Sequence, residues 1–231
     1  MALDFPNSPT LNQTFVGQGG VLYIWDGAKW VASTSGLPGG PYAPLAALGV
    51  GRNRLHNSCF SINQRGNASG TALAAGAYGH DRWKAGSGGC TYTFTQSQPF
   101  TTITITAGSL QQIVEPMSVD GGTYTLSWTG TAQGRVNAGS YAASPVTVAG
   151  LAANTAITVE FNAGTLGRTQ LEIGSVATPL DYGGSPQQQL AQCQRFYQVH
   201  TQVPYLYAAA GINLTYDCAL PVQMRAAPTA T

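Results

Sequence analysis

The residues of this chain that could do acid–base chemistry are nine carboxylates and three histidines. A glycoside hydrolase needs two carboxylates about 5 to 10 Å apart. The nine acids fall on different expected strands and turns, and no motif singles out a pair. They are Asp4, Asp26, Asp81, Glu115, Asp120, Glu160, Glu172, Asp181 and Asp217. We therefore expect no hydrolase activity.

The sequence also lacks motifs for a nucleophile or a metal ion. No Gly-x-Ser-x-Gly segment occurs, and the histidines His56, His80 and His200 stand apart from nucleophile and metal-ligand spacings. The cysteines show no close ligand spacing, which favours buried free thiols in a protein made in a reducing cytosol. They are Cys59, Cys90, Cys193 and Cys218. We expect no catalysis and no cofactor. A Ca²⁺ site is left open, because loop carbonyls and single carboxylates follow no motif.

The triplet Asp81-Arg82-Trp83 has two interpretations. An indole can stack on a pyranose while a guanidinium donates to its hydroxyls, so the triplet could contact a sugar. The structural alternative is that Asp81 and Arg82 form a buried, hydrogen-bonded pair that fixes the loop at residues 63–66, with Trp83 in the core. We favour the structural role.

Charge is scarce in this chain. Charged residues make up 8% of it, against roughly 25% in an average domain, and the formal net charge is +1. Nucleic-acid binders need clustered Lys and Arg, so we expect no nucleic-acid partner. The start of the chain lacks the basic and apolar regions of a secretion signal, and no apolar run reaches the ~20 residues of a membrane span. We expect synthesis in a bacterial cytoplasm and no membrane insertion.

Short runs that alternate between apolar and polar residues fill the middle of the chain, residues 45–183. Residues 101–106, 123–128 and 156–161 are examples, and glycine or asparagine separates the runs. This pattern predicts half-buried antiparallel strands of about five residues. We therefore expect an all-β fold with a jelly-roll-like antiparallel β-sandwich.

The first part of the chain, residues 1–44, is expected to be a β-hairpin followed by a linker. Asp26-Gly27 lies between two apolar runs and predicts a two-residue type I′ turn. Residues 33–41 have the Gly, Pro and Ser composition of a connector.

The last part, residues 184–231, is expected to hold a short helix and a partial β-module. Ser185 as N-cap, Pro186 and Gln188 predict a capping box, with the helix running to about Arg195. Strands are expected at residues 196–199, 205–207 and 212–216. Their open edges predict completion by other subunits, or by further chain beyond this segment.

Four motifs in a fixed order resemble the appendage proteins of tailed bacteriophages, of the tail-fibre or spike type. They are residues 57–66 with 78–84, residues 170–180, residues 193–197 and residues 221–229. The aromatic hairpin at residues 23–30 is similar to short modules near the start of phage fibres. The resemblance implies a carbohydrate-binding-module-like sandwich in a structural virion protein, which serves particle assembly and attachment to host glycans. It implies no catalytic role for the matched residues, and such proteins usually continue past the last motif.

Aromatic residues outside the matched motifs are the candidate contacts. For a glycan they are Tyr92, Trp128 and Tyr141; Trp128 is more often a core residue, whereas Tyr141 lies in a loop of small residues. For anchoring to the particle they are Tyr23, Trp25 and Trp30. For the interface of a homo-oligomer, expected to be a trimer, they are Tyr205, Tyr207 and Tyr216.

The function expected from the sequence is therefore a structural virion protein of a phage appendage, in contact with other virion proteins and with a host-surface glycan. Two alternatives remain. One is an appendage enzyme that degrades polysaccharide, and the other is a carbohydrate-binding module outside any virus.

Overall fold

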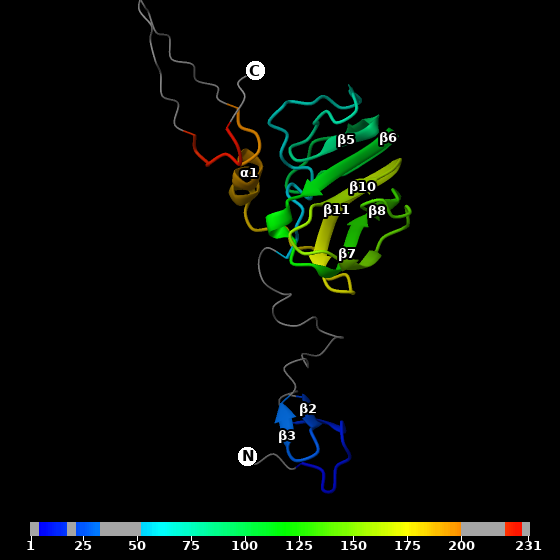
Figure 1. The fold of residues 1–231 in the computed structure, drawn as a ribbon, viewed down its shortest axis with the longest axis vertical. Helices are drawn as coiled ribbons and strands as arrows, with labels where there is room; N and C mark the ends of the chain where they lie inside the picture. The colour runs from blue at the N-terminus through cyan, green and yellow to red at the C-terminus, as the bar shows by residue number, and fades with distance from the viewer. Residues whose placement is uncertain (1–4, 18–21, 33–51, 200–219, 228–231) are drawn as a thin grey trace, which may run out of the picture. The chain divides into compact units, whose positions relative to one another are not determined.

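The computed structural model describes residues 5–17, 22–32, 52–199 and 220–227, and the chain divides into two compact units, Met1–Gly49 and Val50–Thr231. Both units are built of β-strands (Figure 1), and the described residues of the second unit also form one α-helix. The predicted all-β class is confirmed.

The first unit holds a three-stranded antiparallel sheet of β1 (Thr14–Val16), β2 (Leu22–Trp25) and β3 (Trp30–Ala32). Its β2–β3 hairpin was predicted, but the two-residue type I′ turn was wrong. Trp25 pairs with Trp30, so four residues form the loop. Oδ1 of Asp26 accepts the backbone N–H groups of Ala28 and Lys29, both at 2.8 Å, and this side-chain turn takes the place of the tighter one.

In the part of the second unit that the structure describes, one sheet of eight antiparallel strands folds around a hydrophobic core. The strands are β4 (Ala72–Leu73), β5 (Lys84–Phe94), β6 (Ile103–Val114), β7 (Gly122–Thr129), β8 (Gly134–Val136), β9 (Val146–Leu151), β10 (Ile157–Phe161) and β11 (Gly164–Ile173). A 3₁₀ helix, η2 (Pro116–Ser118), follows β6.

Strand β6 is the branch point of this sheet. One of its edges pairs with β5, while the other pairs with β11 near its beginning and with β10 near its end. Beyond a bulge between Gly167 and Gln170, β11 leaves β6 and pairs with β7. The two layers expected of a sandwich are thus joined by hydrogen bonds through β11.

Three strands are at least twice as long as the predicted five residues: β5 has 11, β6 has 12 and β11 has 10. Strand β5 exceeds the predicted length because it includes the stretch Gly86-Ser87-Gly88-Gly89, whose sequence resembles a loop. It is absorbed as an irregularity in the pairing with β6 between Ala85 and Cys90.

The core lies between the two arms of the folded sheet. Trp83 is fully buried, as predicted, and its ring lies 6.0 Å from that of Phe161 on β10. The Phe161 ring in turn meets Trp128 of β7 edge-on at 5.1 Å. Aromatic contacts therefore connect the arms across the core.

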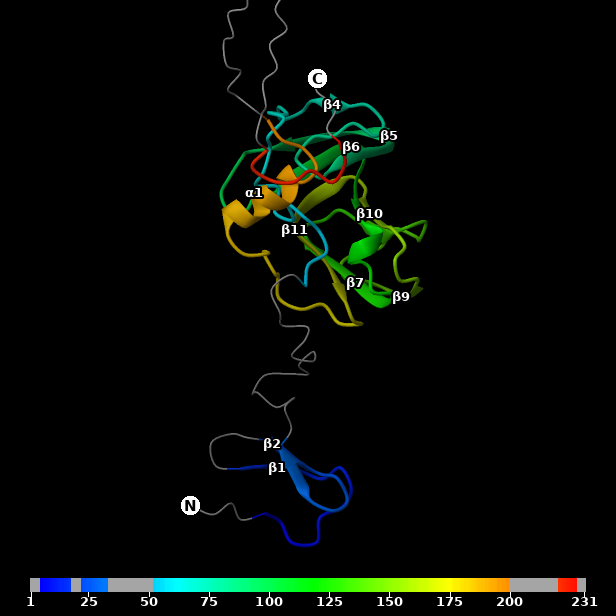
Figure 2. The ribbon, with the colours of Figure 1, turned by 60° about the vertical axis from the view of Figure 1, so that its left-hand side comes forward.

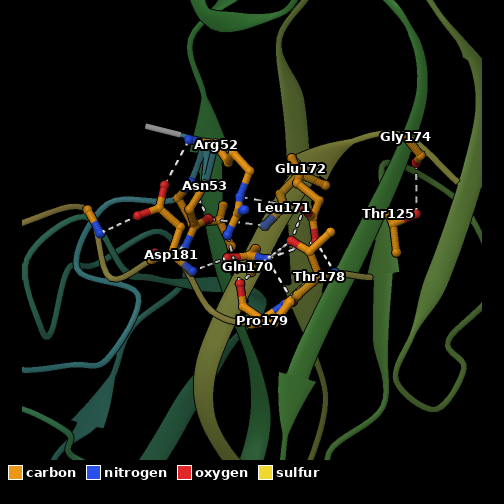
Figure 3. A network of polar contacts seen from close by, with 12 residues as sticks. Arg52, Asn53, Thr125, Gln170, Leu171, Glu172, Gly174, Thr178, Pro179 and Asp181 are labelled. Carbon is orange, nitrogen blue, oxygen red and sulfur yellow. Dashed lines mark hydrogen bonds and ion pairs between the residues drawn. The ribbon is translucent and has the colours of Figure 1, made fainter. Parts of the chain in front are cut away.

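A polar network joins the segments just before and just after the strands of the sheet to the end of β11 (Figure 3). Glu172, 1% exposed, accepts bonds from the backbone N–H and the hydroxyl of Thr178 at 2.8 and 2.6 Å, and from Gln170 at 2.8 Å. Arg52 donates its backbone N–H to Asp181 and its guanidinium to the carbonyl of Pro179, both at 2.8 Å. The segment before the sheet is thereby held to the segment after it, and the motif at residues 170–180 has a structural role.

Helix α1 (Pro186–Gln194) begins with the predicted capping box: Ser185 accepts from the N–H of Gln188, whose side chain accepts from the N–H of Ser185. The helix belongs to the second unit (Figure 2). There, Oε1 of Gln189 accepts the N–H of Asn57 at 3.1 Å. Among the described residues, no helix is both long and apolar enough to cross a bilayer.

The strand predicted at residues 196–199 was wrong. The N–H groups of Phe196 and Tyr197 both donate to the carbonyl of Cys193, so the helix closes in a turn. The aromatic ring of Phe196 serves instead as a surface for the guanidinium of Arg82, 3.5 Å from its centre. The strands predicted at residues 205–207 and 212–216, with Tyr205, Tyr207 and Tyr216, lie outside the described residues.

Candidate binding face of the sheet

Two of the three predicted glycan contacts are core residues. Tyr92 is 1% exposed and Trp128 is 6% exposed. The Tyr92 hydroxyl accepts the backbone N–H of His80 at 2.9 Å, and the Trp128 indole donates to the carbonyl of Ala132 at 2.8 Å. Both rings lie on the core-facing side of their strands, so neither can stack on a ligand that lies in solvent. The prediction was wrong for these two residues.

Tyr141 is half-buried and lies beside the edge strand β8. Gly134 and Ala142 exchange backbone hydrogen bonds of 2.9 and 3.0 Å, which sets Tyr141 opposite Arg135. The Arg135 guanidinium lies 4.5 Å from the centre of the Tyr141 ring. An aromatic ring and a cation are therefore stacked on the outer side of the sheet.

The carboxylate of Glu160 binds the groups around it. Its Oε2 accepts two bonds from Arg135, at 2.9 and 2.6 Å, and its Oε1 accepts the Ser109 hydroxyl at 2.5 Å. On β10, Val159 and Phe161 are fully buried in the core, so Glu160 between them faces outward. Its exposed fraction is nevertheless only 7%, because these partners cover it.

Their interactions keep Glu160 and Arg135 charged at neutral pH. Burial, the largest influence, raises the pKa of Glu160, but hydrogen bonds from Ser109, Arg135 and Tyr141 outweigh it and leave the pKa below the usual value. The hydrogen bond to Glu160 raises the pKa of Arg135. Glu160 is therefore an acceptor for hydroxyl or N–H groups and is poorly suited to be the general acid that glycoside hydrolysis requires.

Gly86 on β5 makes room for this arrangement. A Cβ atom there would collide with the Ser109 hydroxyl and would lie 2.8 Å from Oε1 of Glu160. Only glycine lets both side chains lie across the strand at this point.

The predicted hydrogen-bonded pair of Asp81 and Arg82 does not form, because each side chain has other partners. Asp81 accepts the backbone N–H and the side-chain amide of Gln64 at 2.7 and 2.8 Å, so its expected hold on the loop at residues 63–66 is confirmed. Arg82 donates to the carbonyl of Ile113 at 2.7 Å and stacks on Phe196. Both residues lie in a turn, in which Arg82 has a positive φ of 71°.

The anchoring candidates of the first unit pack against one another. The ring of Phe5 stacks on Trp30 at 5.5 Å and meets Tyr23 at 4.9 Å, while Trp25 and Trp30 lie 5.7 Å apart. All three candidates are half-buried. The apolar side chains most exposed on this unit are aliphatic: Leu11, Val16 and Val31. The anchoring role stays a prediction.

Three cysteines, Cys59, Cys90 and Cys193, are free and buried as predicted, and Cys218 lies outside the described residues. Burial raises the pKa of Cys59 to about 11 and that of Cys90 to about 12, so these thiols are unreactive. In the described part of the chain, no group of three or more His, Cys, Asp or Glu residues could hold a metal ion.

Sequence reasoning missed Arg135, Glu160, Ser109 and Gly86 as parts of one site. A charged residue at an outward position of an alternating strand was the only available signal, and it applied to Glu160 alone. Searches among protein-family models, curated proteins and solved structures find no match to this chain.

Proposed function

We propose that this chain is a non-enzymatic structural protein of a tailed-phage appendage, which helps to hold the particle to a host surface by binding a glycan weakly. The virion assignment rests on the four motifs that resemble tail-fibre and spike proteins. The glycan assignment rests on one observation: Tyr141, Arg135 and Glu160 are gathered on the outer side of the sheet.

This arrangement suits a sugar in three respects. A half-buried tyrosine offers a ring to the apolar face of a pyranose. Arg135 offers donor N–H groups, and its hydrogen bonds to Glu160 hold the guanidinium in place. The charges of these two residues offset each other, so binding depends on shape and hydrogen bonds more than on net charge.

A general-acid role for Glu160 in hydrolysis is disfavoured because its lowered pKa keeps this carboxylate ionised. A carbohydrate-binding module outside any virus would use the same face, and only the location of the chain in purified particles separates these two assignments. The proposed trimer rests on tyrosines outside the described residues.

The experiment is to replace Tyr141 with alanine and measure binding of the labelled protein to an array of bacterial surface glycans. We expect binding to fall about tenfold, equivalent to ~1.4 kcal/mol, with a melting temperature within a few degrees of wild type.

Phe100→Ala is the matched control. Phe100 is 38% exposed and carries Arg168 at 4.5 Å, the same distance as in the Arg135–Tyr141 pair. Its loss should leave glycan binding unchanged. Equal binding by wild type and Tyr141→Ala, or no glycan bound by the wild type, would refute the proposal.

A further inference from the structure

The strand register places Tyr141 at one end of a longer row of side chains. Glu160 is the cross-strand partner of both Arg135 on β8 and Gln111 on β6. Gln111 is also the partner of Lys84 on β5, and Lys84 pairs with Tyr78 through an isolated bridge. Direct partners in antiparallel strands point to the same side of a sheet. The row therefore runs Tyr78, Lys84, Gln111, Glu160, Arg135 and Tyr141.

The row has a tyrosine at each end and polar side chains between. Tyr78 is 42% exposed, and the Arg65 guanidinium lies 5.0 Å from its ring centre, much as Arg135 lies beside Tyr141. Five steps between strands of about 4.8 Å each give a length of about 24 Å, which is that of roughly four to five linked pyranose rings.

On one side of the row, the residues next to its middle have small side chains or none. Gly86 has no side chain, and Ser109 is folded down onto Glu160. Farther along, the exposed amides of Gln133 and Asn162 contact each other. On the other side, Arg82 and the Phe196 ring stacked on it rise next to Ile113. A chain that crosses the strands along the row would meet small and amide groups on one flank and an aromatic ring on the other.

We infer that this row is an extended binding track for a linear glycan of about four to five pyranose units, which lies across the strands with its end units on Tyr78 and Tyr141. Gln111 and the guanidinium of Arg135, which Glu160 holds in place, supply polar groups to hydroxyls along the middle. The inference rests on the proposed glycan binding and adds the length, the direction and the second platform.

The test is calorimetric titration of the full chain with linear oligosaccharides of glucose, galactose and N-acetylglucosamine, each from two to six units. In at least one series, we expect the dissociation constant to fall with each added unit up to four or five and then to level off. Tyr78→Ala and Tyr141→Ala should each weaken the longest ligand about tenfold and bring the levelling one or two units earlier. Phe100→Ala should reproduce the wild-type series.

The outcomes separate this inference from the proposed function. If Tyr141→Ala weakens binding but Tyr78→Ala does not, or if a disaccharide binds as tightly as a hexasaccharide, the track is refuted while glycan binding at Tyr141 stands. If no oligosaccharide and no array glycan binds the wild-type protein, both are refuted. Melting temperatures near the wild-type value would show that loss of binding in a variant is not loss of folding.

Discussion

His80 should make the stability of the second unit depend on pH. Its ring is fully buried, with Nδ1 2.9 Å from the Tyr92 hydroxyl and Nε2 3.3 Å from Oε1 of Gln96. That hydroxyl already accepts the N–H groups of His80 and Asn67, so its own proton is donated to Nδ1. The imidazole is therefore neutral and carries its proton on Nε2.

The expected size of the effect follows from the pKa. Burial lowers the pKa of His80 from 6.5 to about 4. As the pH falls below 6.5, the unfolded chain takes up a proton that the folded chain refuses, so the free energy of unfolding decreases until the folded-state pKa is reached. At ~1.36 kcal/mol per pH unit, the loss between about pH 7.5 and about pH 5 is roughly 2 kcal/mol.

The assay is urea unfolding of the wild type and of His80→Gln at several pH values. Glutamine can still bond to Tyr92 and Gln96 but does not titrate, so the wild type should lose about 2 kcal/mol relative to this variant by about pH 5. His56, whose pKa burial also lowers to about 4, is present in both proteins and cancels. A difference between the two proteins that does not change with pH would refute the assigned protonation state.

Two further predictions concern the buried network and the first unit. Glu172→Ala removes the acceptor of the Thr178 N–H and hydroxyl and the buried carboxylate beside Arg52, and should cost about 3 to 5 kcal/mol in urea unfolding. Asp120→Ala, at an ion pair whose aspartate side chain is 60% exposed, should cost less than about 1 kcal/mol. Similar losses in the two variants would contradict the structural role of the network. Deletion of residues 1–40 should leave the second unit folded, by circular dichroism, but absent from assembled particles; normal incorporation would contradict the anchoring role.

The sequence predicts local structure well where a local cause acts. Alternation along residues 101–106 and 123–128 placed strands correctly, and Ser185 with Gln188 fixed the start of the helix, because each signal lies within a few residues. It failed at residues 196–199, where aromatic residues that suggest a strand instead pack against arginine side chains from distant parts of the chain.

The binding face could not be predicted because it depends on register. Tyr78 and Tyr141 are far apart in the sequence and share a face only through five successive pairings. Strand β8 has three residues, too few to show alternation, so Arg135 gave no sign of its orientation. Long-range pairing decides which outward residues meet, and a single sequence carries no direct record of it.

The contacts at the end of α1 also make the second unit a suitable site for exchanging a segment. The N–H of Arg225 donates to the carbonyl of Arg195 at 2.9 Å, and the amide of Gln198 donates to the carbonyl of Val222 at 2.6 Å. These bonds hold residues 195–198 and 222–225 side by side, so the stretch that connects them begins and ends at one place on the framework. Doubling the length of such a connection costs only about 0.6 kcal/mol in closure entropy. Segments of different length and specificity could therefore be grafted between residues 199 and 220 while the sheet stays intact.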